Sequence, residues 1–172
     1  KAYSVIQASK DVDGAHFIGQ LELDPSATPI PPVTPAAVVA LLDHYGVDVR
    51  NKSVVVVGRS RIVGSPLAHM LNKRGAIVTV AHTEVSPDKL QSLLGSADVV
   101  VSTAGSPGAF KAEWLKPGAE VVNVGTTFVE EEDSLFSDFE GDLPSVAHRY
   151  SPVPGGVGPL SAAFLFQNVA QA

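Results

Sequence analysis

Apolar residues follow two different periodicities along most of this chain. Short valine-rich runs predict strands, and the run Val54–Val57, which has no polar residue, is typical of a strand buried on both faces of a parallel sheet. Between these runs, apolar residues recur every three or four positions, which predicts helices. The expected strands are 53–57, 77–81, 98–102 and 120–124, and the expected helices are 34–45, 66–73, 87–94 and 159–170.

Strands that alternate with helices through short connections predict right-handed β-α-β units. We therefore expect an α/β fold: a Rossmann-like, doubly wound, mostly parallel sheet with helices on both faces. Residues 35–172 carry this pattern, and Thr34 and Gly46 are the expected caps of their first helix. Residues 1–34 show no such pattern and contain a proline cluster, so we interpret them as an irregular arm.

Composition narrows the classes of function. The 172 residues carry a net charge of −6, which gives no basic surface for nucleic acid or anionic lipid. No apolar run approaches the roughly 20 residues that span a bilayer. Cysteine is absent and the histidines are scattered, so thiolate chemistry is excluded and no metal site is expected. We expect a cytoplasmic protein, or an organellar one if a targeting segment preceded Lys1.

The loop after the first strand is the strongest candidate for a binding site. The strand ends at Gly58 and a helix opens near Gly64 or Pro66, and a helix N-terminus at the carboxyl end of a strand suits a pyrophosphate. Arg59 adds a positive charge with a forked set of donors. The segment departs from the Gly-x-Gly-x-x-Gly fingerprint, so its spacing leaves open both a phosphate loop and a tight turn.

Three further strand ends support the phosphate loop. His82-Thr83-Glu84 follows the second strand, where doubly wound domains contact the adenosine ribose. Thr83 could donate its hydroxyl there, whereas a carboxylate at Glu84 would repel a 2′-phosphate; the simplest interpretation of His82 and Glu84 is a solvated loop. The segments 103–105 and 124–126 end the third and fourth strands with small residues, which leave room for a flat ring.

Three other segments have unusual composition. Prolines and glycines alternate through 152–159, and such a loop is shaped in more detail than a plain connection requires. Lys10–Gly14 is rich in charge, and from its residues alone it is best interpreted as a surface turn. Glu130–Asp133 is acidic and is expected to be a solvated loop.

Taken in order, four motifs resemble those of the bifunctional methylenetetrahydrofolate dehydrogenase/methenyltetrahydrofolate cyclohydrolases. The motifs are Lys10–Gly14, Pro32–Pro35, Gly58–Pro66 and Pro152–Pro159. The resemblance spans essentially the whole chain and implies the C-terminal NAD(P)-binding domain of that family. Residues 1–34 would then lead to an N-terminal folate domain, and we expect the chain, which starts at Lys1, to be part of a longer protein.

The resemblance also implies a reaction, ligands and site residues. Hydride would pass from 5,10-methylenetetrahydrofolate to NADP, or possibly NAD, and water would convert the methenyl product to 10-formyltetrahydrofolate. The implied partners are tetrahydrofolate derivatives and a second copy in a homodimer. The implied cofactor-binding residues are Gly58, Arg59, Ser60, Ile62, Val63, Gly64, His82, Thr83, Thr103, Gly105, Thr126 and Ser161. The implied folate-binding residues are Asp13, Pro154, Gly155 and Gly158.

The catalytic lysine of the family lies in a Tyr-x-x-x-Lys motif of the N-terminal domain, and this chain lacks that motif. We therefore expect no catalytic residue here and little activity from the chain alone. An alternative is a non-catalytic dinucleotide-binding or interaction module, suggested by departures from the family at Thr126 and Leu143-Pro144. An unrelated Rossmann-type oxidoreductase with a non-folate substrate is a third interpretation, and the loop 152–159 argues against it.

Overall fold

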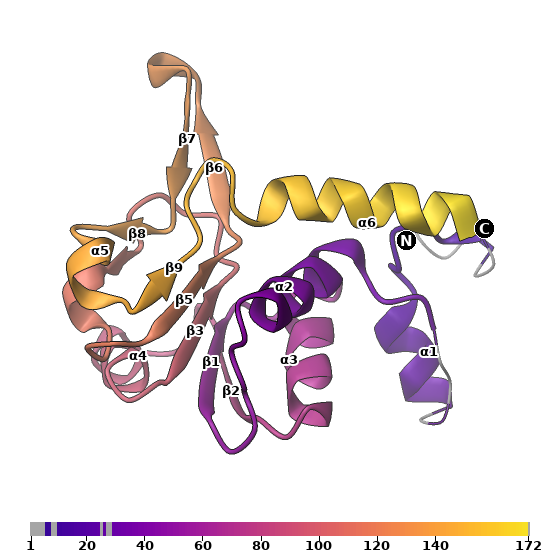
Figure 1. Cartoon of the computed structure of the whole chain (residues 1–172), viewed down its shortest axis with the longest axis horizontal. Helices are drawn as coiled ribbons and strands as arrows, with labels where there is room; N and C mark the ends of the chain where they lie inside the picture. The colour runs from indigo at the N-terminus through magenta and orange to yellow at the C-terminus, as the bar shows by residue number, and fades with distance from the viewer. Residues whose placement is uncertain (1–5, 8–9, 25, 27–28, 172) are drawn as a thin grey trace.

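A five-stranded parallel sheet forms the centre of the molecule (Figure 1). The computed structural model describes residues 6–7, 10–24, 26 and 29–171. The strands are β1 (Ser53–Val57), β2 (Ile77–Ala81), β3 (Val99–Ser102), β5 (Glu120–Asn123) and β9 (Arg149–Tyr150), in the spatial order β2-β1-β3-β5-β9. All four pairings between them are parallel, which confirms the expected Rossmann-like α/β fold.

The valines of the strands divide between two hydrophobic cores. Because successive side chains of a strand point to opposite faces, Val54 and Val56 enter one core while Val55 and Val57 enter the other. Val99 and Val101 of β3 join the first core in the same way. The unbroken valine runs are therefore explained by a sheet with no solvent-facing side at its centre.

Helices cover both faces of the sheet, as expected. The first core is closed by α2 (Val33–His44), α3 (Gly64–Lys73) and α6 (Val157–Gln171). The second is closed by α4 (Pro87–Leu94), the 3₁₀ turn η3 (Ala112–Trp114) and α5 (Leu143–Val146). The predicted strands and helices match these bounds within about two residues, except that α5 and β9 were not predicted.

The ends of α2 show one correct and one wrong prediction. Gly46 has φ +64° and follows the last turn, where its N–H donates to the Asp43 carbonyl and the Val47 N–H donates to the Leu42 carbonyl. This is a Schellman C-cap, as expected. Thr34 is not the N-cap: the helix already includes Val33 and follows Pro32, whose carbonyl accepts the first helical hydrogen bond.

The prediction of an irregular arm over residues 1–34 is wrong for α1 (Phe17–Leu23). This helix packs beside α3, where the buried Phe17 ring meets His69 edge-on with a centroid distance of 6.0 Å. Seven residues with a central glycine, Gly19, are too short to form a stable helix in isolation. The contact with α3 stabilises the helix, and nothing in the local sequence reveals that contact.

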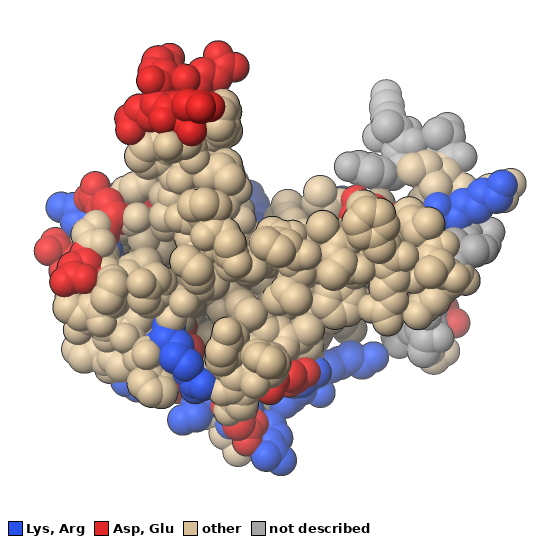
Figure 2. Space-filling view, turned by 45° about the horizontal axis from the view of Figure 1, so that its top comes forward, with Lys and Arg blue, Asp and Glu red and all other residues tan. Residues whose placement is uncertain are grey.

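A β-hairpin stands clear of the body of the protein (Figure 1). It consists of β6 (Thr126–Val129) and β7 (Ser134–Ser137), joined by the 3₁₀ turn η4 (Glu130–Glu132). The acidic side chains gather at its tip, so the expectation that Glu130–Asp133 is solvated is confirmed (Figure 2). A second small pairing joins β4 (Phe110–Lys111) to β8 (Phe139–Glu140). Within the described residues, no helix is both long and apolar enough to cross a membrane.

Candidate functional site

The carboxyl ends of β1 and β3 meet at the switch point of the sheet, where the strand order reverses. From β1 the chain goes first to β2 on one side and later to β3 on the other. Ligands of doubly wound sheets bind in the crevice at such a point. Here Gly58 follows β1 and Thr103 follows β3, and the Thr103 N–H and hydroxyl both donate to the Val57 carbonyl, each at 2.8 Å.

Two glycines allow the loop after β1 to fold back tightly on itself. Gly58 has φ +122°, and a Cβ there would lie 2.0 Å from Thr103 Oγ1. A Cβ on Gly64 would lie 2.1 Å from the Gly58 carbonyl oxygen. At Gly64 any other residue requires a shift of the backbone, and at Gly58 it meets the Thr103 side chain in a backbone conformation that favours glycine. These glycines bring the backbone of the loop to the N-terminus of α3, and this cradle is of the kind that fits a dinucleotide pyrophosphate.

Serine hydroxyls hold the same loop in shape. Ser60 Oγ accepts the N–H groups of Val63 at 3.1 Å and Gly64 at 3.3 Å. Ser65 Oγ donates to the Arg59 carbonyl at 3.2 Å. Ile62 and the Arg59 side chain are exposed on the outside of the loop. The loop is therefore preformed, and it leads directly into the N-terminus of α3.

The end of β2 lies beside this loop. The Gly58 N–H donates to the Ala81 carbonyl at 2.8 Å, and Arg59 Nη2 lies 2.8 Å from Glu84 Oε1. His82 Nδ1 accepts the Glu84 N–H at 3.3 Å, and Thr83 is exposed next to it. The structure thus brings Arg59, His82 and Thr83 to one corner, as the sequence predicted, but the arginine is already paired.

A buried polar network that the sequence analysis missed supports the ends of β3 and β5. Asp138 is fully buried, and its carboxylate accepts hydrogen bonds from the Ser102 hydroxyl and from the N–H groups of Ala104 at 3.0 Å and Ser106 at 2.9 Å. Asn123 accepts the Asp138 N–H at 3.0 Å. The signal in the sequence was faint: a polar residue, Ser102 or Asn123, at the end of each valine run.

The network leaves no room for a side chain at Gly125. The Asn123 amide donates to the Gly125 carbonyl at 2.6 Å, and a Cβ on Gly125 would lie 2.1 Å from Asp138 Oδ2. A Cβ there would also lie 2.5 Å from the Gly105 nitrogen, so the two loops are in contact. Gly105 and Thr126 are exposed at the ends of these loops. The buried network therefore holds in place the two loops at which the sequence predicted room for a flat ring.

The remaining predicted residues lie on α6, in the loop before it, or on the arm that contacts it. Ser161, in the second turn, donates its hydroxyl to the Val157 carbonyl at 3.2 Å. Pro154 and Gly155 are exposed in the loop before the helix, which contains a cis Val153–Pro154 bond, and Gly158 is exposed in the first turn. Asn168 Nδ2, ten residues farther along, donates to the Val12 carbonyl at 2.8 Å. Because Asp13 follows Val12, the predicted folate residues lie toward the two ends of α6, with Pro154, Gly155 and Gly158 at its start and Asp13 beside Asn168.

The arm around Asp13 is organised by its neighbour Asp11. The buried Asp11 carboxylate accepts the N–H groups of Ala15 at 3.1 Å and His16 at 2.7 Å, and it lies 2.7 Å from His16 Nδ1. Burial acts to raise the pKa of Asp11, but the hydrogen bonds from His16 and Ala15 outweigh it and the net pKa is lowered. Desolvation, followed by the charge of Asp11, raises the pKa of Asp13. Asp13 therefore takes up a proton more readily than an ordinary aspartate.

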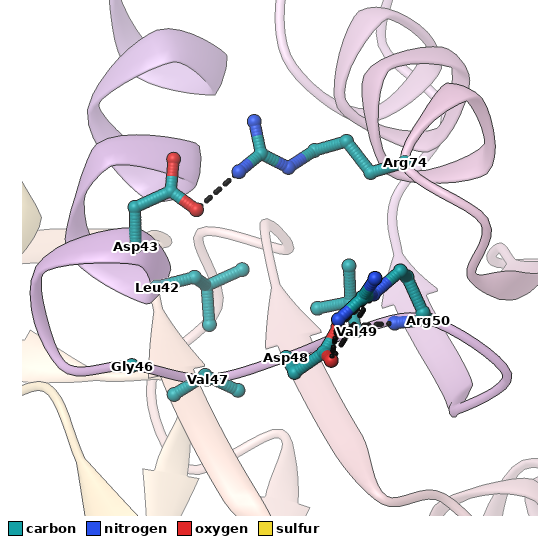
Figure 3. Close-up of a pocket in the computed structure, with 8 residues that line it drawn as sticks. All are labelled: Leu42, Asp43, Gly46, Val47, Asp48, Val49, Arg50 and Arg74. Carbon is teal, nitrogen blue, oxygen red and sulfur yellow. Dashed lines mark hydrogen bonds and ion pairs between the residues drawn. The ribbon is translucent and has the colours of Figure 1, made fainter.

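Two hollows of the surface lie away from the Gly58–Gly64 loop, and Gly155 of the proline-glycine loop lines one of them. One of about 480 Å³ lies at the amino-terminal end of the sheet, beside the loop that enters β1 (Figure 3). The ion pairs Asp43–Arg74 and Asp48–Arg50 line it. Another, of about 470 Å³, lies between α2 and β9. In the part of the chain that the structure describes, no group of three or more His, Asp or Glu side chains could hold a metal ion.

Comparisons with known proteins agree with this geometry. The sequence model described as "Tetrahydrofolate dehydrogenase/cyclohydrolase, NAD(P)-binding domain" matches residues 32–172. The "Bifunctional protein FolD" of Thermus thermophilus is 42% identical over 172 residues, which are all of this chain and 60% of that protein. The FolD protein of Zymomonas mobilis is 40% identical over 177 residues and is covered to 59%. The chain thus spans about 60% of the length of these relatives.

Solved structures give the same result. The Trypanosoma brucei N5,N10-methylenetetrahydrofolate dehydrogenase-cyclohydrolase, complexed with NADP and an inhibitor, superposes with a TM-score of 0.89 at 38% identity, over 98% of this chain and 60% of that one. The bifunctional enzyme of Campylobacter jejuni gives 0.88 at 35% identity, over 96% and 58%. The resemblance found in the sequence is thereby confirmed. The chain belongs to the tetrahydrofolate dehydrogenase/cyclohydrolase family, whose NAD(P)-binding domain it forms.

Proposed function

We propose that this chain is the cofactor-binding part of an enzyme that interconverts 5,10-methylenetetrahydrofolate and 5,10-methenyltetrahydrofolate with NAD(P), and that also hydrolyses the methenyl form to 10-formyltetrahydrofolate. The observation that carries the proposal is the tight loop between Gly58 and Gly64 at the switch point of the sheet. The names of the relatives, which are bifunctional dehydrogenase-cyclohydrolases, support both activities.

Each part of the crevice has a proposed role. The loop Gly58–Gly64, with Ser60, Ile62 and Val63, holds the pyrophosphate, while Arg59, His82 and Thr83 surround the adenosine ribose. Bound NAD(P)+ supplies the hydride acceptor. Thr103, Gly105, Thr126 and Ser161 border the nicotinamide end, where the buried Asp138 network keeps the loops 103–105 and 124–126 in place. This chain orients the cofactor, and we place no catalytic residue in it.

The folate contacts are proposed for two segments joined by α6. Pro154, Gly155 and Gly158 border one side of the folate cleft, and Asp13 binds the pterin from the arm. The two segments lie toward opposite ends of α6, and we assign the rest of the cleft to the folate domain that the family resemblance implies. We assign residues 1–34 to the connection with a folate domain and 35–172 to the cofactor domain.

We also propose that the protein acts as a homodimer. The hairpin β6–β7 exposes Phe128 and Leu135, whose side chains are 53% and 41% accessible. Exposed apolar residues on a projecting hairpin are typical of a surface that another chain covers. The cytoplasmic location expected from the sequence stays a prediction.

Calorimetric titration of the 172-residue chain with NAD+ and with NADP+ tests the proposal. We expect binding of at least one of them, no binding by Gly64→Ala, and unchanged binding by Gly19→Ala, a glycine whose added Cβ would meet only Arg61 Nη2 at 3.5 Å. Far-UV circular dichroism shows whether Gly64→Ala stays folded. Failure of the wild-type chain to bind either cofactor at millimolar concentration contradicts the proposal, and folate-dependent reduction of NAD(P)+ by the chain alone contradicts the absence of a catalytic residue.

A further inference from the structure

An ion pair joins the ends of two adjacent strands at the ribose side of the crevice. Arg59 Nη2 and Glu84 Oε1 are 2.8 Å apart. Arg59 lies two residues after Val57 of β1, and Glu84 lies three residues after Ala81 of β2, and Val57 and Ala81 are paired in the parallel register. The contact therefore connects the phosphate loop to the segment that follows the second strand.

The end of the second strand is where a doubly wound domain distinguishes its two cofactors. NAD presents a ribose 2′-hydroxyl there, which a carboxylate binds by accepting a hydrogen bond. NADP presents a 2′-phosphate, which an arginine binds and a carboxylate repels. This chain places one residue of each kind at the corner, so the contact between them decides which cofactor is favoured.

The pairing leaves the corner without net charge for a phosphate. Arg59 is engaged by Glu84, and the other arginine of the loop, Arg61, faces Glu22 of α1 with Nη2 and Oε2 3.5 Å apart. Thr83 adds no charge. A 2′-phosphate would have to take Arg59 from Glu84 and then accept a carboxylate as its neighbour. A 2′-hydroxyl needs neither change, because it can donate to Glu84 while the ion pair stays intact.

We propose that Glu84 determines the cofactor preference of this chain and that it favours NAD over NADP. The proposal rests on the cofactor site proposed above, and it reverses the order that the sequence alone suggested. The turn keeps the backbone of Glu84 in place: the Glu84 N–H donates to His82 Nδ1, and the Val85 N–H donates to the His82 carbonyl at 2.9 Å. The side chain can swing away from the ribose, but its backbone cannot.

The expected discrimination is moderate. Arg59 and Glu84 side chains are 53% and 73% accessible, and ion pairs that water reaches so freely are weak. A phosphate can therefore displace Glu84 from Arg59 at little cost, and the repulsion that follows is screened by salt. We expect a preference for NAD of about tenfold, rather than the larger factors of sites with buried charges.

Titration of four proteins with NAD+ and NADP+ tests the proposal. They are the wild-type chain, Glu84→Gln, Glu113→Gln and the double variant Arg59→Gln/Glu84→Gln. Glu113 is the matched control, because it is 76% accessible, also faces a cation, and lies on η3 away from the crevice. We expect Glu84→Gln to lower the ratio of the two dissociation constants, NADP+ over NAD+, about tenfold, whereas Glu113→Gln leaves it unchanged. The double variant should lose the gain in NADP+ affinity, because that gain depends on the freed Arg59.

The outcomes separate this proposal from the proposed function. If the wild-type chain binds NADP+ as tightly as NAD+, or if Glu84→Gln shifts the ratio no more than Glu113→Gln, the role of Glu84 is wrong although the cofactor site stands. If no cofactor binds to any of the four, both proposals fail. Thermal melting of each variant confirms that the exposed substitutions leave the fold intact.

Discussion

The two edges of the central sheet are built in opposite ways. At the carboxyl edge the backbones of neighbouring loops touch, and added Cβ atoms at Gly58, Gly64 and Gly125 would lie 2.0–2.1 Å from their neighbours. At the amino edge the chain is open: Gly46 has nothing within 4 Å of its Cβ position, and exposed ion pairs line the hollow of Figure 3.

The difference between the two edges indicates which of them carries the cofactor site. Both edges carry arginines paired with carboxylates, Arg59 with Glu84 at the carboxyl edge and Arg50 and Arg74 with Asp48 and Asp43 beside the hollow, so charge does not distinguish the edges. The carboxyl edge offers a preformed loop at the N-terminus of α3, and beside it a loop after β3 that the buried Asp138 carboxylate holds in place. A dinucleotide is long and flat and lies across strand ends. A preformed backbone surface therefore identifies its binding site better than the volume of a hollow does.

The largest expected effect is on the free energy of unfolding, and it is tested with one glycine from each edge. Gly125→Ala places a methyl group against Asp138 Oδ2 and the Gly105 nitrogen, and we expect it to lower the free energy of unfolding by about 3 kcal/mol. Gly46→Ala meets only the cost of a positive φ, about 1 kcal/mol. Urea denaturation of both variants measures the difference. Equal losses would show that the two edges are equally tolerant and would remove the contrast.

A smaller effect concerns Glu120, at the amino end of β5. Burial acts to raise its pKa, but hydrogen bonds from Arg149 and His148 outweigh it and the net pKa is below the ordinary 4.5. Its folded pKa is thus lower than its unfolded one, so its stabilisation is complete above about pH 4.5 and is lost as the pH falls through the folded value. We expect Glu120→Gln to cost about 1–2 kcal/mol at pH 7 and to flatten the acid side of the stability curve. Denaturation midpoints measured from pH 3 to pH 7 test this assignment. It is wrong if stability depends on pH as steeply in Glu120→Gln as in the wild-type chain.

The smallest effect concerns the hollow of Figure 3. Arg74→Ala breaks the exposed ion pair with Asp43, and we expect a loss of less than about 1 kcal/mol in the free energy of unfolding. The dissociation constants of NAD+ and NADP+ should not change, because the hollow lies at the opposite edge from the loop. A severalfold weakening of either cofactor would mean that the amino edge takes part in binding and that the two edges are not independent.

Local pattern was sufficient to predict the framework of the fold. The valine runs and the periodic helices place β1, β2, β3, β5 and the main helices within about two residues, because each of these elements buries a face that its own sequence reveals. The elements that were missed have no such face. α1 depends on the neighbouring α3, and the hairpin strands β6 and β7 contain only exposed and half-buried residues.

The residues of the candidate site likewise fall into those that the sequence could reveal and those that it could not. The loop Gly58–Gly64 is continuous in sequence, so its glycines and Arg59 could be identified before the structure was known. Asp138 could not, because the groups that it binds, at Ser102, Ala104 and Ser106, lie 32–36 residues earlier in the chain. The pairing of Arg59 with Glu84 likewise needs the parallel register of β1 and β2, although both residues were noticed separately.

The hydrogen bond between Asn168 and the Val12 carbonyl connects the last turns of α6 to the N-terminal arm. It joins residues 156 positions apart, and Asn168 is buried although it is polar. One end of this rod of 15 residues, about 22 Å long, follows the proline-glycine loop, while the other end supports the turn that carries Asp13. A tilt of α6 would therefore displace both segments at once, because the same helix follows the proline-glycine loop at one end and contacts the turn of Asp13 near the other.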